Sequence, residues 1–174
     1  MHRREFLAGI GSVSVLATSA VIALRGPPSI GNDGKDPVTI ETLDAPGSES
    51  GEMKLPAPDR PTFIDFFATW CPPCESQMPA LAEANERIGN DVLFVSVTSE
   101  GLNDGEIAEW WETHGGNWWI GRDRRTELTA RYSPSGYPHA VSIDAAGETQ
   151  WSASGEKTVD ELVGGIQQAL GGNE

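Results

Sequence analysis

The sequence is poor in cysteine and histidine, and each shortage restricts the chemistry that the chain can carry. Its 174 residues contain two cysteines, Cys71 and Cys74, so any thiol chemistry belongs to this one pair. A structural zinc site needs about four ligands at set spacings, whereas the three histidines, His2, His114 and His139, are isolated from one another. We therefore expect no bound metal and no other cofactor.

Positive charge is also scarce. Twelve lysines and arginines stand against 26 aspartates and glutamates, which gives a formal net charge of −14. So acidic a surface disfavours nucleic acid and anionic membrane surfaces as partners. It suits a protein that stays soluble in high salt, where the repulsion between its own charges is screened. We therefore predict a halophilic protein.

The first 25 residues differ in character from the rest of the chain. Arg3-Arg4-Glu5-Phe6-Leu7 opens an uncharged stretch of nineteen residues, 6–24. This pattern resembles a twin-arginine export signal, and its length is also near the roughly 20 residues of a membrane span. We predict a signal or membrane anchor over 1–25, a linker over 26–37, and an extracytoplasmic protein that is secreted or held at the outer face of the cell membrane. Whether the segment is cleaved stays open.

Residues 38–171 are predicted to form a single domain in which strands and helices alternate. Alternating or continuous apolar runs predict strands at 38–43, 52–55, 62–68, 91–97, 117–120, 140–144 and 149–153. Helical spacing of apolar residues predicts helices from the cysteine pair to Gly89 and at 107–114, 124–132 and 159–170. The first two strands can pair as a hairpin ahead of the main domain.

The two cysteines follow directly after the buried strand 62–68, in Trp70-Cys71-Pro72-Pro73-Cys74. A strand that runs into Cys-x-x-Cys is typical of a thioredoxin-like redox motif. If a helix begins here, Cys71 is its N-cap, where free N–H groups and the helix dipole favour a thiolate. Pro72 is then the first helical residue, where a missing N–H costs nothing. Cys74 lies one turn further on, close enough for a disulfide.

Other interpretations of the pair are weaker. A purely structural disulfide across so short a loop would restrain the unfolded chain by only about 2 kcal/mol. A peroxidase would carry its nucleophilic cysteine without a second cysteine close behind. The pattern therefore favours dithiol–disulfide exchange.

Asp65 is the one charged residue in the strand 62–68, six residues before Cys71. Its side chain could turn outward to water. Alternatively, it could be buried beneath the cysteines with a raised pKa, ready to accept the proton of Cys74.

The order of strand, Cys-x-x-Cys helix, strand, helix, Gly-x-Pro turn, hairpin and final helix is that of thioredoxin. Over roughly Val38 to Leu170 the chain resembles thioredoxin-fold proteins of the TlpA/ResA type, above all in Phe-Ala-Thr-Trp-Cys-Pro-Pro-Cys and the Gln-Met-Pro-Ala-Leu that follows. The resemblance implies an α/β fold whose central mixed sheet is flanked by helices, with an N-terminal β-hairpin. It also implies a helix–strand insertion within the 67 positions (138 − 71) that separate Cys71 from Pro138.

The resemblance also assigns roles to residues. Cys71 is the exposed nucleophile and Cys74 the resolving thiol, with Asp65 as the buried acid. Pro138 is the cis-proline that faces them. The substrate-binding residues are Trp70, Pro72, Pro73, Gly136, Tyr137 and Pro138. His139 departs from the small residue expected after the proline, and could tune the site or cap the strand.

The function implied is that of an exported thiol–disulfide oxidoreductase that reduces disulfides of extracytoplasmic client proteins. We expect a monomer that takes electrons from a membrane donor and does not bind nucleic acid. Two prolines between the cysteines remove N–H groups that would stabilise the Cys71 thiolate, so we expect a moderate thiol pKa of about 6–7.5. A disulfide-introducing oxidase, or a non-enzymatic module that binds a partner or holds copper through its thiols, stays open.

Overall fold

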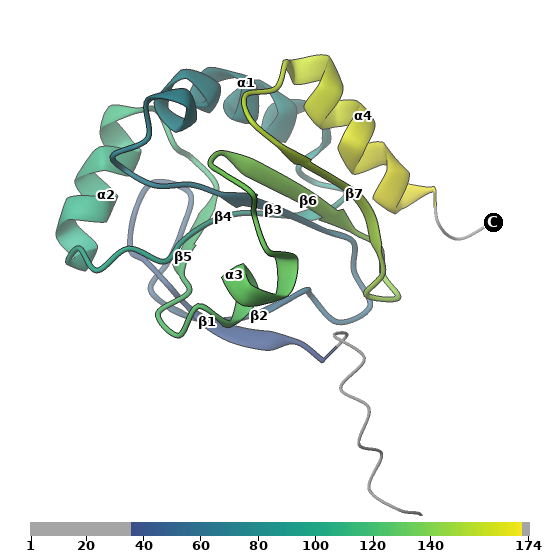
Figure 1. The fold of residues 1–174 in the computed structure, drawn as a ribbon, viewed down its shortest axis with the longest axis horizontal. Helices are drawn as coiled ribbons and strands as arrows, with labels where there is room; N and C mark the ends of the chain where they lie inside the picture. Colours follow the sequence, from purple (N-terminus) through teal and green to yellow (C-terminus); the bar gives the residue numbers. More distant parts are fainter. Residues whose placement is uncertain (1–35, 172–174) are drawn as a thin grey trace, which may run out of the picture. The chain divides into compact units, whose positions relative to one another are not determined.

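The computed structural model describes residues 36–171, so the predicted signal and all but the end of the predicted linker lie outside the described residues. The described elements are β1 (Val38–Thr42), β2 (Gly51–Leu55), β3 (Thr62–Phe66), α1 (Pro72–Ile88), β4 (Leu93–Thr98), α2 (Asp104–Thr113), β5 (Trp119–Arg122), α3 (Glu127–Tyr132), β6 (His139–Ile143), β7 (Thr149–Ser154) and α4 (Val159–Leu170) (Figure 1). Among these residues, none of the helices has the length and apolar character needed to cross a membrane.

The strands of the described domain form one seven-stranded sheet in the order β2-β1-β5-β4-β3-β6-β7. Strands β3, β4 and β5 run parallel. Strand β6 pairs antiparallel with β3, and β7 pairs antiparallel with β6 at the edge of the sheet. The hairpin of β1 and β2 joins the far side through an antiparallel pairing of β1 with β5. The predicted mixed sheet with an N-terminal hairpin is confirmed, and α2, β5 and α3 occupy the expected insertion between β4 and β6.

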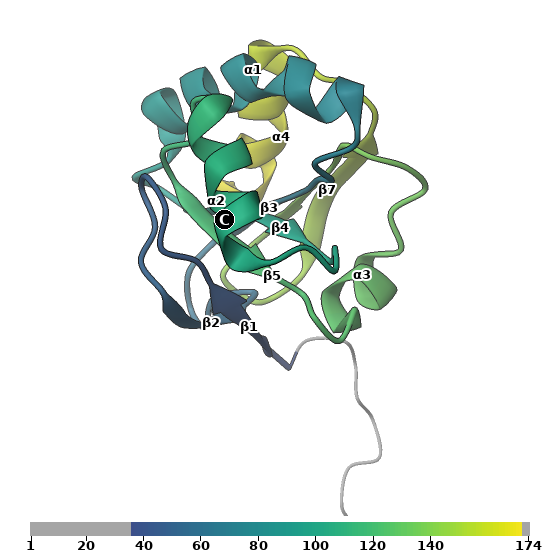
Figure 2. The ribbon, with the colours of Figure 1, turned by 90° about the vertical axis from the view of Figure 1, so that its left-hand side faces the viewer.

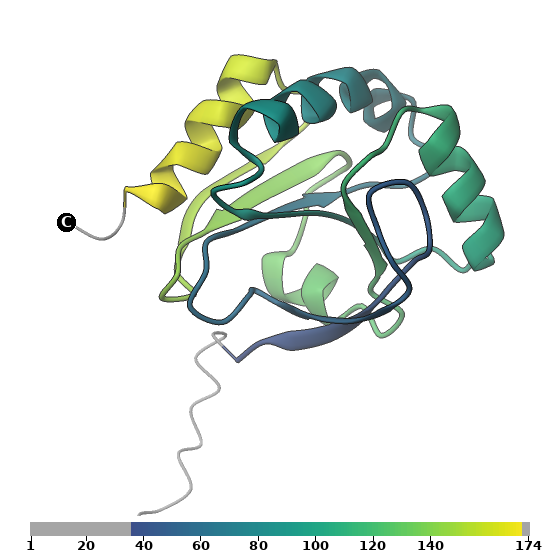
Figure 3. The same ribbon diagram turned by 180° about the vertical axis from the view of Figure 1, so that it is seen from behind.

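Strand β3 is buried on both faces, because successive side chains of a strand point to opposite sides of its sheet. Phe63, and Phe67 just after the end of the strand, belong to the core beneath α1, α2 and α4. Ile64 and Phe66 belong to a second core that α3 and the β1–β2 hairpin cover. Figures 1, 2 and 3 show α1 and α4 along one side of the sheet and α3 on the other. The strand that leads to the cysteines is therefore buried along its whole length, as are its neighbours β4 and β6.

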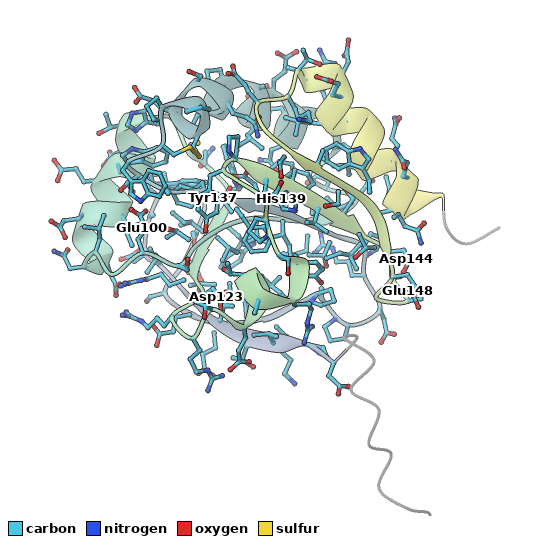
Figure 4. The ribbon with its side chains drawn as sticks, viewed as in Figure 1. Glu100, Asp123, Tyr137, His139, Asp144 and Glu148 are labelled. Atoms are coloured by element: carbon cyan, nitrogen blue, oxygen red, sulfur yellow. A yellow bond between two sulfur atoms is a disulfide. The ribbon has the colours of Figure 1, made fainter. Side chains whose placement is uncertain are left out.

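The starts of β5 and α3 differ from the sequence-based expectation because strand pairing sets the first and side-chain hydrogen bonds set the second. Strand β5 begins at Trp119 rather than at position 117, since it pairs with β4 from Val95↔Trp119 onward. Helix α3 begins at Glu127 rather than at position 124. The buried carboxylate of Asp123, labelled in Figure 4, accepts the backbone N–H groups of Glu127 and Thr129 and thereby fixes the start of this short helix.

Candidate active site

Cys71 and Cys74 are joined in a disulfide at the start of α1, with their Cα atoms 5.3 Å apart. Cys71 is the N-cap of the helix and has an extended backbone, and the two prolines occupy the first two helical positions. This is the placement that the spacing of the cysteines predicts. The only two cysteines of the sequence are thus a bonded pair at a helix N-terminus.

The sulfur of Cys71 accepts a hydrogen bond of 3.3 Å from the backbone N–H of Cys74. At the N-terminus of a helix the free N–H groups of the first turn would ordinarily surround such a side chain. Pro72 and Pro73 have no N–H group, so the first one available is that of Cys74. The sulfur therefore receives less stabilisation from the backbone than the same position would without the prolines.

The expectation that Cys71 is exposed is wrong for this disulfide form. Only 5% of its surface is exposed, against 2% for Cys74. The sulfur of Cys71 is bonded to Cys74, which lies on the buried face of α1. The same sulfur also accepts the capping hydrogen bond of the helix, so it points inward. Cys71 is still the more exposed of the two residues.

The rim of the site is aromatic. Trp70 is 70% exposed, and it is the single large apolar side chain so exposed within residues 36–171. Its ring meets that of Tyr137 edge-on at 6.2 Å between centroids, and Tyr137 also packs against the core that contains both cysteines. The bond from Tyr137 to Pro138 is cis, as predicted. The fold thus brings the Pro138 segment beside the cysteine pair, across 67 positions of sequence (138 − 71).

The remaining predicted substrate-binding residues are accessible. Pro72 and Pro73 are exposed on the first turn of α1, and Gly136 is exposed in the loop before Pro138. A Cβ atom built on Gly136 would meet nothing within 4 Å. The space around this glycine is open, which leaves room for another backbone to approach.

Asp65 is buried, with 1% of its surface exposed, so the outward-facing alternative is excluded. It lies two residues after Phe63 on β3, so the two side chains are on the same face and Asp65 faces the core that holds both cysteines. Burial raises the pKa of Asp65 from its ordinary 3.8 to about 7, although a hydrogen bond from the Ser96 hydroxyl to Oδ2, at 3.0 Å, opposes the rise. A carboxyl group with this pKa can take up or release a proton near neutral pH.

His139 lies on the opposite face of the sheet from Asp65, because it pairs with Phe66 in the β3–β6 register. Its Nδ1 lies 2.6 Å from the hydroxyl of Ser154 and its Nε2 3.2 Å from that of Ser152, both on β7. Burial, and then the charge of Lys157, lower the pKa of His139. His139 directly follows the cis-proline and is labelled in Figure 4, and its two contacts therefore link the start of β6 to the edge strand β7.

The sequence did not reveal Glu100, which supports the cysteine loop from the neighbouring strand. Its carboxylate accepts the backbone N–H of Thr69 at 2.8 Å and the hydroxyl of Thr69 at 2.9 Å. The signal available was its position just after β4, since the carboxyl ends of parallel strands meet at one edge of a sheet. A second missed contact joins His114 at the end of α2 to Glu75 in the first turn of α1, at 3.3 Å.

No group of three His, Cys, Asp or Glu side chains within the described residues could hold a metal ion.

The family model described as Redoxin matches residues 37–166, about three quarters of the chain. The chain belongs to the Redoxin family. Curated relatives include the thiol-disulfide oxidoreductase ResA of Bacillus cereus, which is 24% identical over 106 residues that cover 61% of each protein. ResA of Geobacillus thermodenitrificans is 29% identical over 103 residues, 58% of each protein. A shorter match, 38% identical over 42 residues, covers 24% of this chain and 25% of the chloroplastic thioredoxin Y of Oryza sativa subsp. japonica. These matches span between a quarter and three fifths of the relatives' length.

Solved structures of similar proteins support the fold of this Redoxin-family chain. StoA from Bacillus subtilis superimposes with a TM-score of 0.64 at 21% identity, over 75% of this chain and 96% of that one. A secreted Mycobacterium tuberculosis disulfide oxidoreductase homologous to E. coli DsbE gives 0.64 at 20% identity, over 78% and 98%. The predicted thioredoxin-like fold and the resemblance to thiol–disulfide oxidoreductases of the ResA type are therefore confirmed.

Proposed function

We propose that this protein is an exported reductase of disulfides in extracytoplasmic client proteins, and that Cys71 and Cys74 carry the reaction. The observation that carries the proposal is the bonded cysteine pair at the N-terminus of α1, beside the exposed Trp70 and the cis-proline segment. In the disulfide form the pair has given up two electrons, and the dithiol is the form that reacts with a client.

The reaction begins from the dithiol form. The Cys71 thiolate attacks one sulfur of the client disulfide, so that a mixed disulfide forms and the second client sulfur leaves as a thiolate, which takes a proton. Cys74 then gives its proton to the Asp65 carboxylate and attacks the sulfur of Cys71. This second exchange forms the Cys71–Cys74 disulfide and releases the remaining client sulfur as a thiolate, which takes the proton held by Asp65. The client has then gained two electrons and two protons, one from solvent in the first exchange and one from Asp65 in the second.

The proposed direction follows from the backbone around Cys71. With one N–H donor at 3.3 Å and two prolines beside it, the sulfur lacks the strong thiolate stabilisation of an oxidant. We expect an apparent thiol pKa of about 6–7.5 and a potential of about −180 to −270 mV. A rate profile with iodoacetamide that gives an apparent pKa below about 4.5 would overturn the proposed direction.

Insulin reduction tests the activity. The wild-type dithiol should reduce insulin, and Cys71→Ser should not. Cys74→Ser should accumulate a mixed disulfide with insulin that a thiol reductant releases, because the resolving sulfur is missing. If the wild type and Cys71→Ser are equally inactive, the fold serves as a non-enzymatic module instead. Redox titration against glutathione then separates a reductase from an oxidase, since a potential well above about −180 mV indicates the oxidase.

We also propose that residues 1–25 direct export and that the mature protein works as a monomer with a membrane electron donor. A protein that reduces disulfides outside the cytosol needs electrons carried across the membrane. Replacing Arg3 and Arg4 together by lysine should leave the full-length chain in the cytosol, measured by cell fractionation. An unchanged distribution between fractions would contradict a twin-arginine route.

A further inference from the structure

Three buried residues, two on neighbouring strands and one just ahead of a third strand, form a continuous hydrogen-bonded line inside the core. Asp65 on β3 stands directly opposite Ser96 on β4 in the parallel register. The Ser96 hydroxyl donates to Oδ2 of Asp65 at 3.0 Å, and the indole N–H of Trp118, just ahead of β5, donates to the Ser96 hydroxyl at 3.0 Å. All three side chains are buried.

The chemistry of the groups gives this line a direction. An indole N–H can only donate, and a hydroxyl has one proton and two lone pairs. Trp118 therefore occupies a lone pair of Ser96, and the single Ser96 proton is directed to Asp65. A donor aimed at a carboxyl oxygen favours the ionised form of that group.

The other carboxylate oxygen of Asp65, Oδ1, is buried and accepts no hydrogen bond from any residue of the described domain. Beneath α1, α2 and α4 the buried apolar cluster on this face contains Cys71 and Cys74, and Tyr137 packs against it. Arg122 of β5 is also buried on this face, but its guanidinium is paired with Asp104 of α2. Ala140 of β6, opposite Asp65, and Leu162 and Ile166 of α4 add no charge. Oδ1 is thus the oxygen left to exchange a proton with the cysteine pair.

We propose that Ser96 and Trp118 are positioning residues for Asp65: the indole directs the Ser96 hydroxyl to Oδ2, so that Asp65 stays ionised often enough for Oδ1 to take the proton of Cys74. The inference rests on the proposed function, since it concerns the proton that Cys74 gives up before its sulfur attacks Cys71. Burial and the Ser96 hydrogen bond act in opposite directions on the pKa of Asp65, and together they leave it at about 7.

The chain offers a matched control for each residue. Ser142 lies two residues after Ala140 on β6, so it is on the same face of the sheet as Ser96. It is equally buried, and its hydroxyl has no hydrogen-bond partner among the described residues. Trp111 is a buried neighbour of Trp118, with ring centroids 4.6 Å apart, but its indole donates to the backbone oxygen of Pro46. Neither control residue makes a hydrogen bond to Asp65 or Ser96, so its substitution disturbs the same core and leaves the hydrogen bonds of Asp65 in place.

The test compares Ser96→Ala and Trp118→Phe with Ser142→Ala and Trp111→Phe in the full chain. In the oxidised proteins, the titration of Asp65 is followed by the carboxyl carbon shift in NMR. In the reduced proteins, the pH profile of single-turnover insulin reduction is measured. We expect Ser96→Ala to raise the pKa of Asp65 by about one unit, Trp118→Phe to raise it in the same direction, and both control variants to leave it in place.

The rate should follow the titration. A pKa that rises from about 7 to about 8 lowers the ionised fraction of Asp65 at pH 7 about fivefold, so turnover at pH 7 should fall about fivefold in Ser96→Ala and recover at pH 9. A purely structural role would lower the rate at every pH. If Trp118→Phe fails to fold, Ser96→Ala with its Ser142→Ala control decides the matter.

An Asp65 pKa that is unchanged in Ser96→Ala, or equally raised in the control variants, overturns the inference. A raised pKa with an unchanged pH profile overturns the link to Cys74. If the wild type does not reduce insulin, the proposed function fails, whereas the NMR titration still reports on the hydrogen-bonded line, so the two failures are distinguishable.

Discussion

The carboxylate of Glu100 holds Thr69 at two points, the backbone N–H and the side-chain hydroxyl, at 2.8 and 2.9 Å. Thr69 is two residues before Cys71, in the turn between β3 and α1. Glu100, labelled in Figure 4, follows β4, the parallel neighbour of β3. The turn that delivers the nucleophile is therefore fastened to the adjacent strand by one side chain.

Glu100→Ala should destabilise the protein and slow client reduction. Hydrogen bonds to a charged acceptor contribute about 1.5–3 kcal/mol each. Because Glu100 is only partly buried, we expect the lower limit for the two bonds, a loss of about 3 kcal/mol in the free energy of unfolding, measured with denaturant. Glu109→Ala removes an exposed carboxylate of α2 and serves as the charge-matched control. Equal stability of the two variants would show that the Thr69 contacts contribute nothing.

Asp65→Asn should make the protein more stable at alkaline pH and less active. The pKa of Asp65 is about 7 in the folded chain and near 3.8 in the unfolded chain. Between these values the unfolded state has lost the proton that the folded state keeps, so stability falls as pH rises from about 4 to about 7 and then levels off. The uncharged asparagine does not titrate, so its advantage over the wild type should grow across this window.

The measurement is the free energy of unfolding of the oxidised proteins at pH 4, 6 and 8. Each pKa unit corresponds to about 1.4 kcal/mol, so the difference at pH 8 should be a few kcal/mol. A difference that is the same at all three pH values would mean that Asp65 titrates normally. Reduced insulin turnover in the more stable variant would separate the role of Asp65 in catalysis from its effect on folding.

Gly136→Val should impair reduction of protein clients without affecting the fold. A Cβ at this position meets nothing within 4 Å, and Gly136 is not among the glycines with positive φ. The change in unfolding free energy should stay within about 0.5 kcal/mol. If a client backbone lies along this segment, the side chain should raise KM for insulin about tenfold, a cost of about 1.4 kcal/mol, and leave reduction of a small disulfide unchanged. Gly101→Val, at an equally open glycine outside the Pro138 segment, is the control.

The melting temperature should rise steeply with molar KCl. The formal net charge is −14, and the repulsion within such a chain is screened at high ionic strength. Each kcal/mol of repulsion removed should raise the Tm by about 2–4 °C for a chain of this size. Sucrose stabilises proteins because it is excluded from their surface, and it does not screen charge. A rise in Tm with KCl that clearly exceeds the rise with sucrose therefore reports the screening of charge. A flat response to KCl would end the halophile prediction.

The sequence predicted best what depends on neighbours along the chain. The N-cap position of Cys71 follows from the strand before it and the proline after it. For Asp65 the sequence left burial and an outward-facing side chain as alternatives, and the structure shows that it is buried. The roles of Glu100, Ser96 and Trp118 depend on which strands pair and in which register, and one sequence does not reveal this. The accessibility of Cys71 was missed for a different reason: the bond to Cys74 turns its sulfur inward.

The two prolines between the cysteines have a consequence for the supply of electrons. A thiolate with little backbone support makes the dithiol form costly relative to the bonded form. If the proposed direction holds, most copies of the protein outside the cell rest in the oxidised state, and each becomes useful only after a donor recharges it. Under these conditions the rate of client reduction is limited by the rate at which electrons cross the membrane, and additional copies of the enzyme would not raise it.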